Sequence, residues 1–498
     1  SKEVFVCCLI VSLRCVFWVA PLHTGGGGGG GIDSPRPASQ RAAALVLTAA
    51  MLTTLAAPAF AKTWYIENGD ITISAGKTEG TNKVSQGSTT DEEDTDTVIT
   101  NNNRDTASSH TVTIDAGNDK VEVTLDNVNI KADSGSALTS NGDVTLTLKG
   151  ENHLTGGNGD TYGGDGITSS GSLTISGGTV TATGGNNTGS DGSGGSGIYS
   201  VSGSVTISGG TVNANGGNGG TISGGDGICS SGGVTISSGS TVTANGGSGE
   251  DGSGGRGITS NGGVTVSGGT VNAKGGSGKN GNGGDGILSF NPVAISGGTV
   301  KSNGGSGTIS GGDGIRSLDH VAISGGTVKS NGGSGTNSGG YGIISNDIDL
   351  SGSLELTAKA GSPNGKALSR ADSELDLDTI KDKLGPGAKV TTTDADGKVN
   401  QVSISRPVEP EKPVIPEESS SSSGGGSSAP SAPVSSIPGL TVTDKSGAVI
   451  SYTSTQSGNT LTVCVGRFTA SFRISLSTLR QLRAEGIETI TFQTILCS

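Results

Sequence analysis

Short alternations of apolar and polar residues recur along the chain from about residue 163 to residue 360. One copy reads GGDGITSSGSLTISGGTVTATGG, from Gly163 to Gly185. In its Gly-Ile-x-Ser, Leu-Thr-Ile-Ser and Thr-Val-x-Ala segments, residues two apart share one face of a strand. No window shows helical periodicity. The pattern therefore predicts three short strands per unit, with Gly-Gly pairs at the corners because glycine accepts a positive φ there.

The unit returns six more times, and its isoleucine marks the spacing. The marker residues are Ile167, Ile198, Ile228, Ile258, Ile287, Ile315 and Ile343, with spacings of 31, 30, 30, 29, 28 and 28 residues. One unit is too small to bury its own apolar face, so units must stack. We predict an all-β parallel β-helix with rungs of about 29 residues, in which Ile167 lies under Ile198.

An asparagine precedes the closing Gly-Gly pair in four units. These residues are Asn215, Asn245, Asn303 and Asn331, and Thr183 and Lys274 take their place in two other units. Stacked asparagines can bond side chain to side chain between rungs. We interpret them as structural residues.

The repeat lies within a longer β domain, predicted to cover residues 62–405. Strand-like segments precede it, from Trp64 through Val121 to Leu148, and predict irregular first rungs with a cap. A helix-like patch from Leu375 to Leu384 and a hairpin at Asp394–Gly397 are predicted to cap the other end, because open coils need such protection.

A linker and a second module follow the repeat domain. Residues 406–438 are rich in Pro, Ser, Gly and Glu, which is typical of an extended linker. Residues 439–498 resume the alternation, with strands predicted at Leu440–Val442, Ala448–Tyr452, Leu461–Val465 and Ile487–Phe492 and a short helix at Ser477–Glu485. They predict a small α+β module, which stops abruptly at Ser498 as if truncated.

The N-terminal region carries an export pattern at residues 41–61. Arg36 and Arg41 precede an apolar run from Ala42 to Ala57, and Ala59-Phe60-Ala61 offers a cleavage site before Lys62. This layout predicts a secretory signal peptide, and the run is too short and too rich in Ala and Thr for a good membrane span. Residues 1–40 contain seven consecutive glycines, and we interpret them as a doubtful leader from a wrong start. An additional membrane anchor is the alternative.

Composition limits the classes of function. With 92 glycines, 30% hydrophobic residues and 3% aromatic residues, the 498-residue chain cannot build a conventional core. Its net charge of −13 argues against nucleic acid as a partner. The charge leaves room for a bound cation or for a neutral glycan.

Three sequence features together resemble a known family. They are TWYIENGDITISA after the signal peptide, VTLDNVNI with SALTSNGDVTLTLKGENHLTGG, and the GGDGI…TISGGTV repeat. Over roughly residues 62–405 they resemble the secreted carbohydrate-binding domain family of Clostridia-like bacteria. The resemblance implies a right-handed parallel β-helix that binds cellulose-like and pectic polymers, with calcium in the coil. It supplies no short ligand motif, so no binding residue is carried over.

Four aspartates share one position of the repeat. They are Asp165, Asp226, Asp285 and Asp313, and the same position holds Ser196, Arg256 and Tyr341 in other units. Neighbouring rungs lie about 4.8 Å apart, so the last two aspartates should be close and would repel unless a cation lies between them. A calcium site on these four residues is one hypothesis. An ordinary Asp-Gly turn facing water is the other.

Glycans bind to flat aromatic side chains on a surface. The candidates are Trp64, Tyr65, Tyr162, Tyr199 and Tyr341. We select Tyr162, Tyr199 and Tyr341, in or beside the repeat, as the predicted carbohydrate-binding residues. Packing in a cap or scattered surface positions are the alternatives.

The sequence predicts a binding protein and no catalytic residue. A β-helix lyase combines an Arg or Lys base with an acidic calcium site, and only Arg256 and Arg316 occur among the complete repeat units. We expect a secreted or cell-surface, non-catalytic polysaccharide-binding protein that meets a membrane only through export or surface attachment. A polysaccharide lyase or hydrolase and a structural adhesin or stalk are the alternatives.

Overall fold

The computed structural model describes residues 61–371 and 373–405, together with parts of the segment 440–494. These residues fall into two compact units on either side of the predicted linker. The predicted leader and linker, and the predicted signal peptide up to residue 60, lie outside the described residues. None of the helices in the described part of the chain has the length and hydropathy needed to cross a bilayer.

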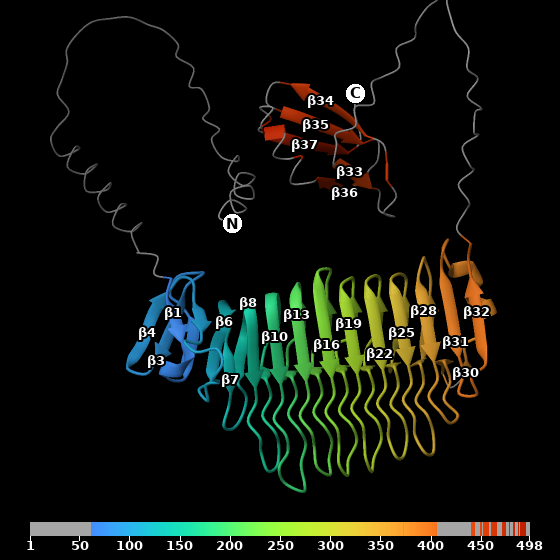
Figure 1. Cartoon of the computed structure of the whole chain (residues 1–498), viewed down its shortest axis with the longest axis horizontal. Helices are drawn as coiled ribbons and strands as arrows, with labels where there is room; N and C mark the ends of the chain where they lie inside the picture. The colour runs from blue at the N-terminus through green and yellow to red at the C-terminus, as the bar shows by residue number, and fades with distance from the viewer. Residues whose placement is uncertain are drawn as a thin grey trace, which may run out of the picture. The chain divides into compact units, whose positions relative to one another are not determined.

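The first unit is a parallel β-solenoid of about 11 turns whose rungs are about 29 residues apart, as predicted. Figure 1 shows the turns side by side along one axis. The marker isoleucines pair in register, since Ile198 is the partner of both Ile167 and Ile228. The first ladder of strands consists of β9 (Ile167–Ser169), β11 (Ile198–Ser200), β14 (Ile228–Ser230), β17 (Ile258–Ser260), β20 (Ile287–Ser289), β23 (Ile315–Ser317), β26 (Ile343–Ser345) and β29 (Leu368–Arg370).

Two further ladders complete each turn. The second consists of the first half of β10 (Leu173–Thr183), then β12 (Val205–Ile207), β15 (Val234–Ile236), β18 (Val264–Val266), β21 (Val293–Ile295), β24 (His320–Ile323) and β27 (Asp347–Leu350). The third consists of the second half of β10, then β13 (Gly210–Asn215), β16 (Ser240–Asn245), β19 (Thr270–Lys274), β22 (Thr299–Asn303), β25 (Thr327–Asn331), β28 (Glu355–Lys359) and β31 (Lys389–Thr393).

The core contains like side chains in stacked columns. In one turn Ile228, Val234, Ile236, Val242 and Ala244 are all buried, one or two residues from each ladder. The serine of each Ile-x-Ser segment also points inward, and in several turns its hydroxyl donates to a carbonyl group of the following corner, whereas the Ser289 hydroxyl has no partner. Ser200 donates to the Gly203 carbonyl and Ser260 to the Gly263 carbonyl, both at 2.8 Å. Serine therefore satisfies a buried carbonyl that an apolar residue would leave unpaired.

The predicted asparagine ladder is confirmed. Asn245 Nδ2 donates to Asn215 Oδ1 at 2.9 Å, and Asn331 Nδ2 donates to Asn303 Oδ1 at 2.8 Å. Lys274 stands between the two pairs, opposite both Asn245 and Asn303. The ladder is therefore broken into two bonded pairs.

Each turn is pinched where two Gly-Gly pairs meet, and we call these paired segments the glycine waist. In one turn the pairs are 216–217, after β13, and 224–225, before β14. The Gly225 N–H donates to the Gly217 carbonyl, and the Gly217 N–H donates to the Gly195 carbonyl of the preceding turn, both at 2.8 Å. A Cβ on Gly217 would lie 2.0 Å from the Gly185 carbonyl oxygen. Backbone thus packs directly on backbone with no space for a side chain.

The loops between the two Gly-Gly pairs project from the waist, and we call their stack the fin. In Figure 1 these loops extend from one side of the row of third-ladder strands. The fin comprises residues 158–162, 186–193, 218–223, 248–253, 277–282, 306–310 and 334–338. Successive loops are bonded, since Gly219 N–H donates to the Ser248 carbonyl and Gly249 N–H to the Ser277 carbonyl, both at 2.9 Å.

Irregular elements close both ends of the solenoid, as predicted. The N-terminal end contains β1 (Thr63–Tyr65), the 3₁₀ turn η1 (Ile66–Asn68), β2 (Ile71–Ala75), β3 (Asn82–Gln86), β4 (Thr89–Asp94), β5 (Val98–Thr100), β6 (Val112–Asp126), β7 (Asn129–Lys131) and β8 (Leu138–Thr155). The other end has β30 (Ser373–Glu374), the 3₁₀ helix η2 (Leu377–Lys383) and β32 (Val399–Ser403). Strand β32 forms the predicted hairpin with β31.

The second unit contains five described strands. They are β33 (Leu440–Thr443), β34 (Thr453–Ser457), β35 (Thr460–Val465), β36 (Ser471–Ile474) and β37 (Thr489–Thr494). Where a strand was predicted at Ala448–Tyr452, the described residues form one antiparallel β-bridge, between Val449 and Thr443, and strand β34 follows from Thr453. Strand β36 was not predicted. Thr478, Leu482 and Arg483 are helical, inside the predicted helix.

Candidate functional site

The four predicted aspartates lie in one column where the chain leaves the waist and enters the first ladder. We call this the corner column; its members are Asp165, Ser196, Asp226, Arg256, Asp285, Asp313 and Tyr341. Each aspartate accepts the backbone N–H of the column residue on the next turn. Ser196 N–H donates to Asp165, Arg256 N–H to Asp226 and Asp313 N–H to Asp285, all at 2.7 Å, and Tyr341 N–H donates to Asp313 at 2.6 Å.

This hydrogen bond gives a physical reason for aspartate at the corner. A carboxylate oxygen satisfies a backbone donor that would otherwise be left between two turns. The second oxygen takes a side-chain donor, such as Thr168 for Asp165 at 2.7 Å and Thr259 for Asp226 at 2.6 Å. Asp313 does not face water, since it is only 4% exposed, and the other three aspartates are half-buried.

Arginines supply positive charge beside the closest pair of carboxylates. Arg316 Nη1 lies 3.2 Å from Asp313 Oδ2, and Arg256 Nε lies 4.0 Å from Asp285 Oδ2. A bound cation was one hypothesis for this charge, because Asp285 and Asp313 occupy adjacent turns. The chain itself provides two guanidinium groups at this place.

Burial perturbs the acids of the column. It raises the pKa of Asp165 and of Asp285. Burial and the neighbouring Asp285 together raise the pKa of the Asp313 carboxyl to about 7. An apolar, crowded site penalises the charged form of a carboxyl group, and a second carboxylate adds to the penalty. Asp313 is therefore the column residue whose charge changes near neutral pH.

The corner column lines a groove beside the fin, and we call it the corner groove. It consists of two hollows of about 410 and 350 Å³ that share Arg256. Tyr162, Asp165, Tyr199, Asp226 and Cys229 line the first hollow. Asp285, Asp313, Arg316 and Tyr341 line the second. All seven residues predicted from the sequence to bind glycan or metal thus lie along one groove.

The three tyrosines differ in exposure. Tyr162 is 66% exposed at the end of a fin loop, whereas Tyr199 and Tyr341 are half-buried. Tyr199 occupies the outward middle position of β11, beside Thr168 and Cys229 on the neighbouring strands. The other aromatic candidates lie elsewhere. Trp64 is 3% exposed and donates to Asp94 Oδ2 at 2.8 Å in the N-terminal cap, so it offers no platform.

The donor set at the column is poor for calcium. Ser196 and Arg256 interrupt the series, so at most two carboxylates are adjacent, whereas Ca²⁺ takes six to eight oxygen ligands. Among the residues that the structure describes, no group of three or more His, Cys, Asp or Glu side chains could hold a metal ion. Calcium at this column stays a prediction from the sequence.

Cys229 lines the groove, but its thiol is not suited to act there as a nucleophile or as a metal ligand. Burial raises the pKa of its thiol to about 12. The nucleophile and the metal ligand is the thiolate, which such a site disfavours. Cys229 is therefore a small packed residue between Tyr199 and Thr259.

The arginines are the groove residues that sequence reasoning weighed only as catalytic groups. Arg256 stands at the aspartate position of its unit, and Arg316 stands between Ile315 and Ser317, where side chains point outward. Both side chains are 45% exposed. The position of each arginine in the repeat already places it on the face that carries Asp313 and Tyr199. The sequence could therefore have identified Arg256 and Arg316 as residues of the groove.

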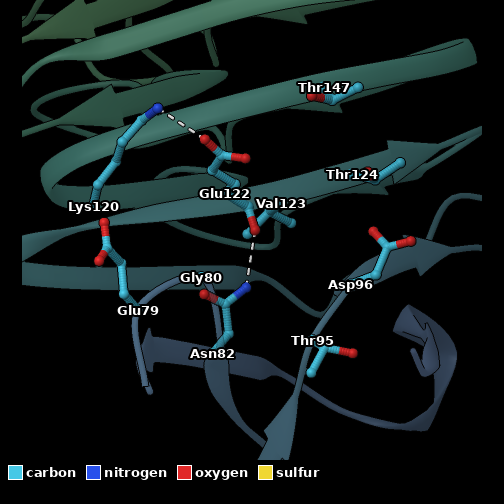
Figure 2. A pocket seen from close by; sticks show the side chains of 10 residues that line it. All are labelled: Glu79, Gly80, Asn82, Thr95, Asp96, Lys120, Glu122, Val123, Thr124 and Thr147. Carbon is cyan, nitrogen blue, oxygen red and sulfur yellow. Dashed lines mark hydrogen bonds and ion pairs between the residues drawn. The ribbon is translucent and has the colours of Figure 1, made fainter. Parts of the chain in front are cut away.

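A separate hollow of about 440 Å³ lies at the N-terminal cap (Figure 2). Figure 2 shows Lys120 bonded to Glu122, at 2.8 Å, and Asn82 bonded to the Glu122 carbonyl, at 2.9 Å. Glu79 and Asp96 add negative charge, and no aromatic residue is among its lining residues. The bond of Asn82 joins β3 of the cap to β6, whereas the bond of Lys120 lies within β6, so we assign this hollow a structural role.

The chain has no match among protein-family models, curated proteins or solved structures. The family resemblance seen in the sequence therefore stays a prediction, and the class of protein is defined by its fold as a glycine-rich parallel β-solenoid.

Proposed function

We propose that this solenoid is a non-catalytic polysaccharide-binding protein that acts outside the cell and holds its polymer in the corner groove. One observation carries the proposal: Tyr162, Tyr199 and Tyr341 line the same groove as Arg256, Arg316 and the aspartates. Sugar rings stack their C–H faces on aromatic rings. Carboxylates and guanidinium groups bond the hydroxyl groups at the ring edges. The extracellular location rests on the export pattern of residues 41–61.

The shape of the groove suits a chain better than a small molecule. Its hollows are open along several turns, and the repeat places similar groups about every 4.8 Å. A linear polymer lying along the solenoid axis would meet Tyr199 and Tyr162 near one end and Tyr341 near the other. A small metabolite would instead require an enclosed pocket.

The test is retention of the full chain on insoluble cellulose, on pectate and on mucin, with calcium and with chelator. We expect retention on a plant polymer, about threefold to tenfold weaker for Tyr162→Ala or Tyr199→Ala, the loss of one stacking contact. Tyr65→Ala is the matched control, since Tyr65 is exposed at the cap outside the groove. No retention on any polymer would contradict the proposal and favour the adhesin or stalk alternative. Loss with chelator would place calcium in the groove.

One observation favours a second candidate, a polysaccharide lyase. Asp313, whose pKa is raised to about 7, lies beside Arg316 in the groove, and an acid near neutrality next to a cation is a common feature of active sites. Both Asp313 oxygens are already bonded, to the Tyr341 N–H and to Arg316, so we rank binding first. Ultraviolet absorbance of an unsaturated product, released by the wild type and not by Arg316→Ala, would favour the lyase.

A further inference from the structure

The outer face of the third ladder is divided into two halves of different charge. On β10, β13 and β16 its outward side chains are all Thr or Asn. On the next five strands five lysines point outward and are exposed; we call them the lysine face. They are Lys274, Lys301, Lys329, Lys359 and Lys389, on β19, β22, β25, β28 and β31. These five strands lie next to one another in Figure 1.

The five lysines of the lysine face are not matched by an equal number of acidic side chains. Glu355 is the one carboxylate among the outward residues of these five strands, and no ion pair joins any of the five lysines to the described residues. Lys301 and Lys329 are direct partners in register. Like charges placed opposite each other destabilise a sheet. Glu355 is the direct partner of Lys389, but fold stability gives no reason for Lys301 facing Lys329, on a chain whose net charge is −13.

The arrangement fits a linear polyanion. One lysine stands on each of five successive turns, at three positions along the strands. Lys301 and Lys329 are direct partners, Lys274 and Lys359 lie two residues further along, and Lys389 lies two residues before. Neighbouring turns are about 4.8 Å apart, so a polymer along the solenoid axis would pass these five long side chains over about 19 Å. Every cation is a lysine, a compact point charge that suits a phosphate, whereas the repeat places its arginines in the corner groove. No aromatic or apolar side chain points outward among them, so the face offers nothing for base stacking or for insertion into a bilayer.

We propose that the lysine face binds a linear, non-nucleic-acid polymer of phosphate groups along the solenoid axis, as a second site distinct from the corner groove. Binding is electrostatic, so it weakens as salt rises. The two sites lie on different strand ladders, and the proposal does not rest on glycan binding in the groove. With both sites occupied, one solenoid would hold two polymers side by side.

The experiment titrates labelled inorganic polyphosphate into the full chain and follows fluorescence anisotropy at rising salt, with chelator present. We expect saturable binding that salt abolishes and that Lys301→Gln/Lys329→Gln weakens about tenfold or more, given the strength of a lysine beside an anionic surface. Lys131→Gln/Lys149→Gln is the matched control, because it removes the same charge from exposed lysines outside the lysine face.

Three outcomes would overturn the proposal. They are equal binding by both double variants, tighter binding to polygalacturonate or single-stranded DNA than to polyphosphate, and binding to anionic vesicles alone. Circular dichroism checks that each variant is folded. Retention of the lysine variant on an insoluble glycan separates the two sites, since the groove residues are unchanged.

Discussion

The apolar core and the glycine waist hold the same turn together by different means. In the core, side chains such as Ile228 and Val242 stack on their copies in the next turn, and the contact is non-directional. In the waist, Gly217 and Gly225 have no side chains, and backbone hydrogen bonds of 2.8 Å alternate within and between turns. The core can therefore relax around a change, whereas the waist has no flexible group that could move.

The largest effect is expected in the waist. A Cβ at Gly247 would lie 1.9 Å from the Gly217 carbonyl oxygen, and its nearest neighbours are all backbone atoms. We expect Gly247→Ala to cost more than about 4 kcal/mol, against about 2–5 kcal/mol for Ile228→Ala, which leaves a cavity. Urea denaturation followed by circular dichroism measures both. Gly209→Ala is the control, because the nearest atom to its Cβ would lie 4.0 Å away. Equal free energies of unfolding for Gly247→Ala and Gly209→Ala would mean that the waist can accept a side chain. The contrast between a rigid waist and a core that relaxes would then be lost.

An intermediate effect is expected at the corner column, where the waist joins the core. The pKa of Asp313 is about 7 in the folded protein, against about 3.9 for an ordinary Asp. Between about pH 4 and pH 7 the folded state therefore holds a proton that the unfolded state has lost. The free energy of unfolding falls as pH rises through this window, by up to about 4 kcal/mol, and levels off above it.

Asp313→Asn tests this linkage, because its amide oxygen still accepts the Tyr341 N–H while the titration is lost. We expect the free energy of unfolding, measured by urea denaturation from pH 4 to pH 8, to fall less steeply in this variant than in the wild type. Asp226→Asn makes the same change three turns away and serves as the control. If the free energy of unfolding depends on pH in the same way in Asp313→Asn and in the wild type, the protonation of Asp313 is not linked to folding.

The smallest effect is expected at the asparagine that leads into the waist. Asn245→Ala removes one side-chain bond to Asn215 and leaves a half-buried partner that water can reach. We expect a loss of about 1 kcal/mol, measured as a shift of the urea midpoint. Thr243→Ala is the control for the loss of side-chain volume, because Thr243 also points outward and lies two residues before Asn245 on the same strand. A loss as large as that of Gly247→Ala would mean that the ladder, and not the backbone, holds the waist closed.

The ladders could be predicted from the sequence because alternation and spacing are local properties. The Ile marker, the Val-Thr-Ile strand and the Asn column appear in the structure in the predicted register. The glycine waist could not be predicted, because Gly-Gly reads as a flexible corner in sequence. Only the stacked structure shows Gly185 and Gly217 too close for a side chain.

The candidate site was predicted in part. The repeat placed Asp165, Asp226, Asp285 and Asp313 in one column, and Tyr199 was selected only as an aromatic residue of the repeat. The sequence did not show that the aspartates cap backbone N–H groups, because the donor is on the next turn, 28 to 31 residues away. It also did not show that Arg256 and Arg316 neutralise the acidic pair. Both facts depend on contacts between turns.

The waist also affects how such a chain can change over generations. Gly185 and Gly194 enclose eight fin residues, whereas Gly305 and Gly311 enclose five, and the core strands on either side keep their register. An insertion or deletion in a fin loop therefore leaves the register of the core strands and the packing of the apolar interior unchanged. A gene for this protein can gain or lose residues there, or duplicate a whole repeat, without a compensating change elsewhere.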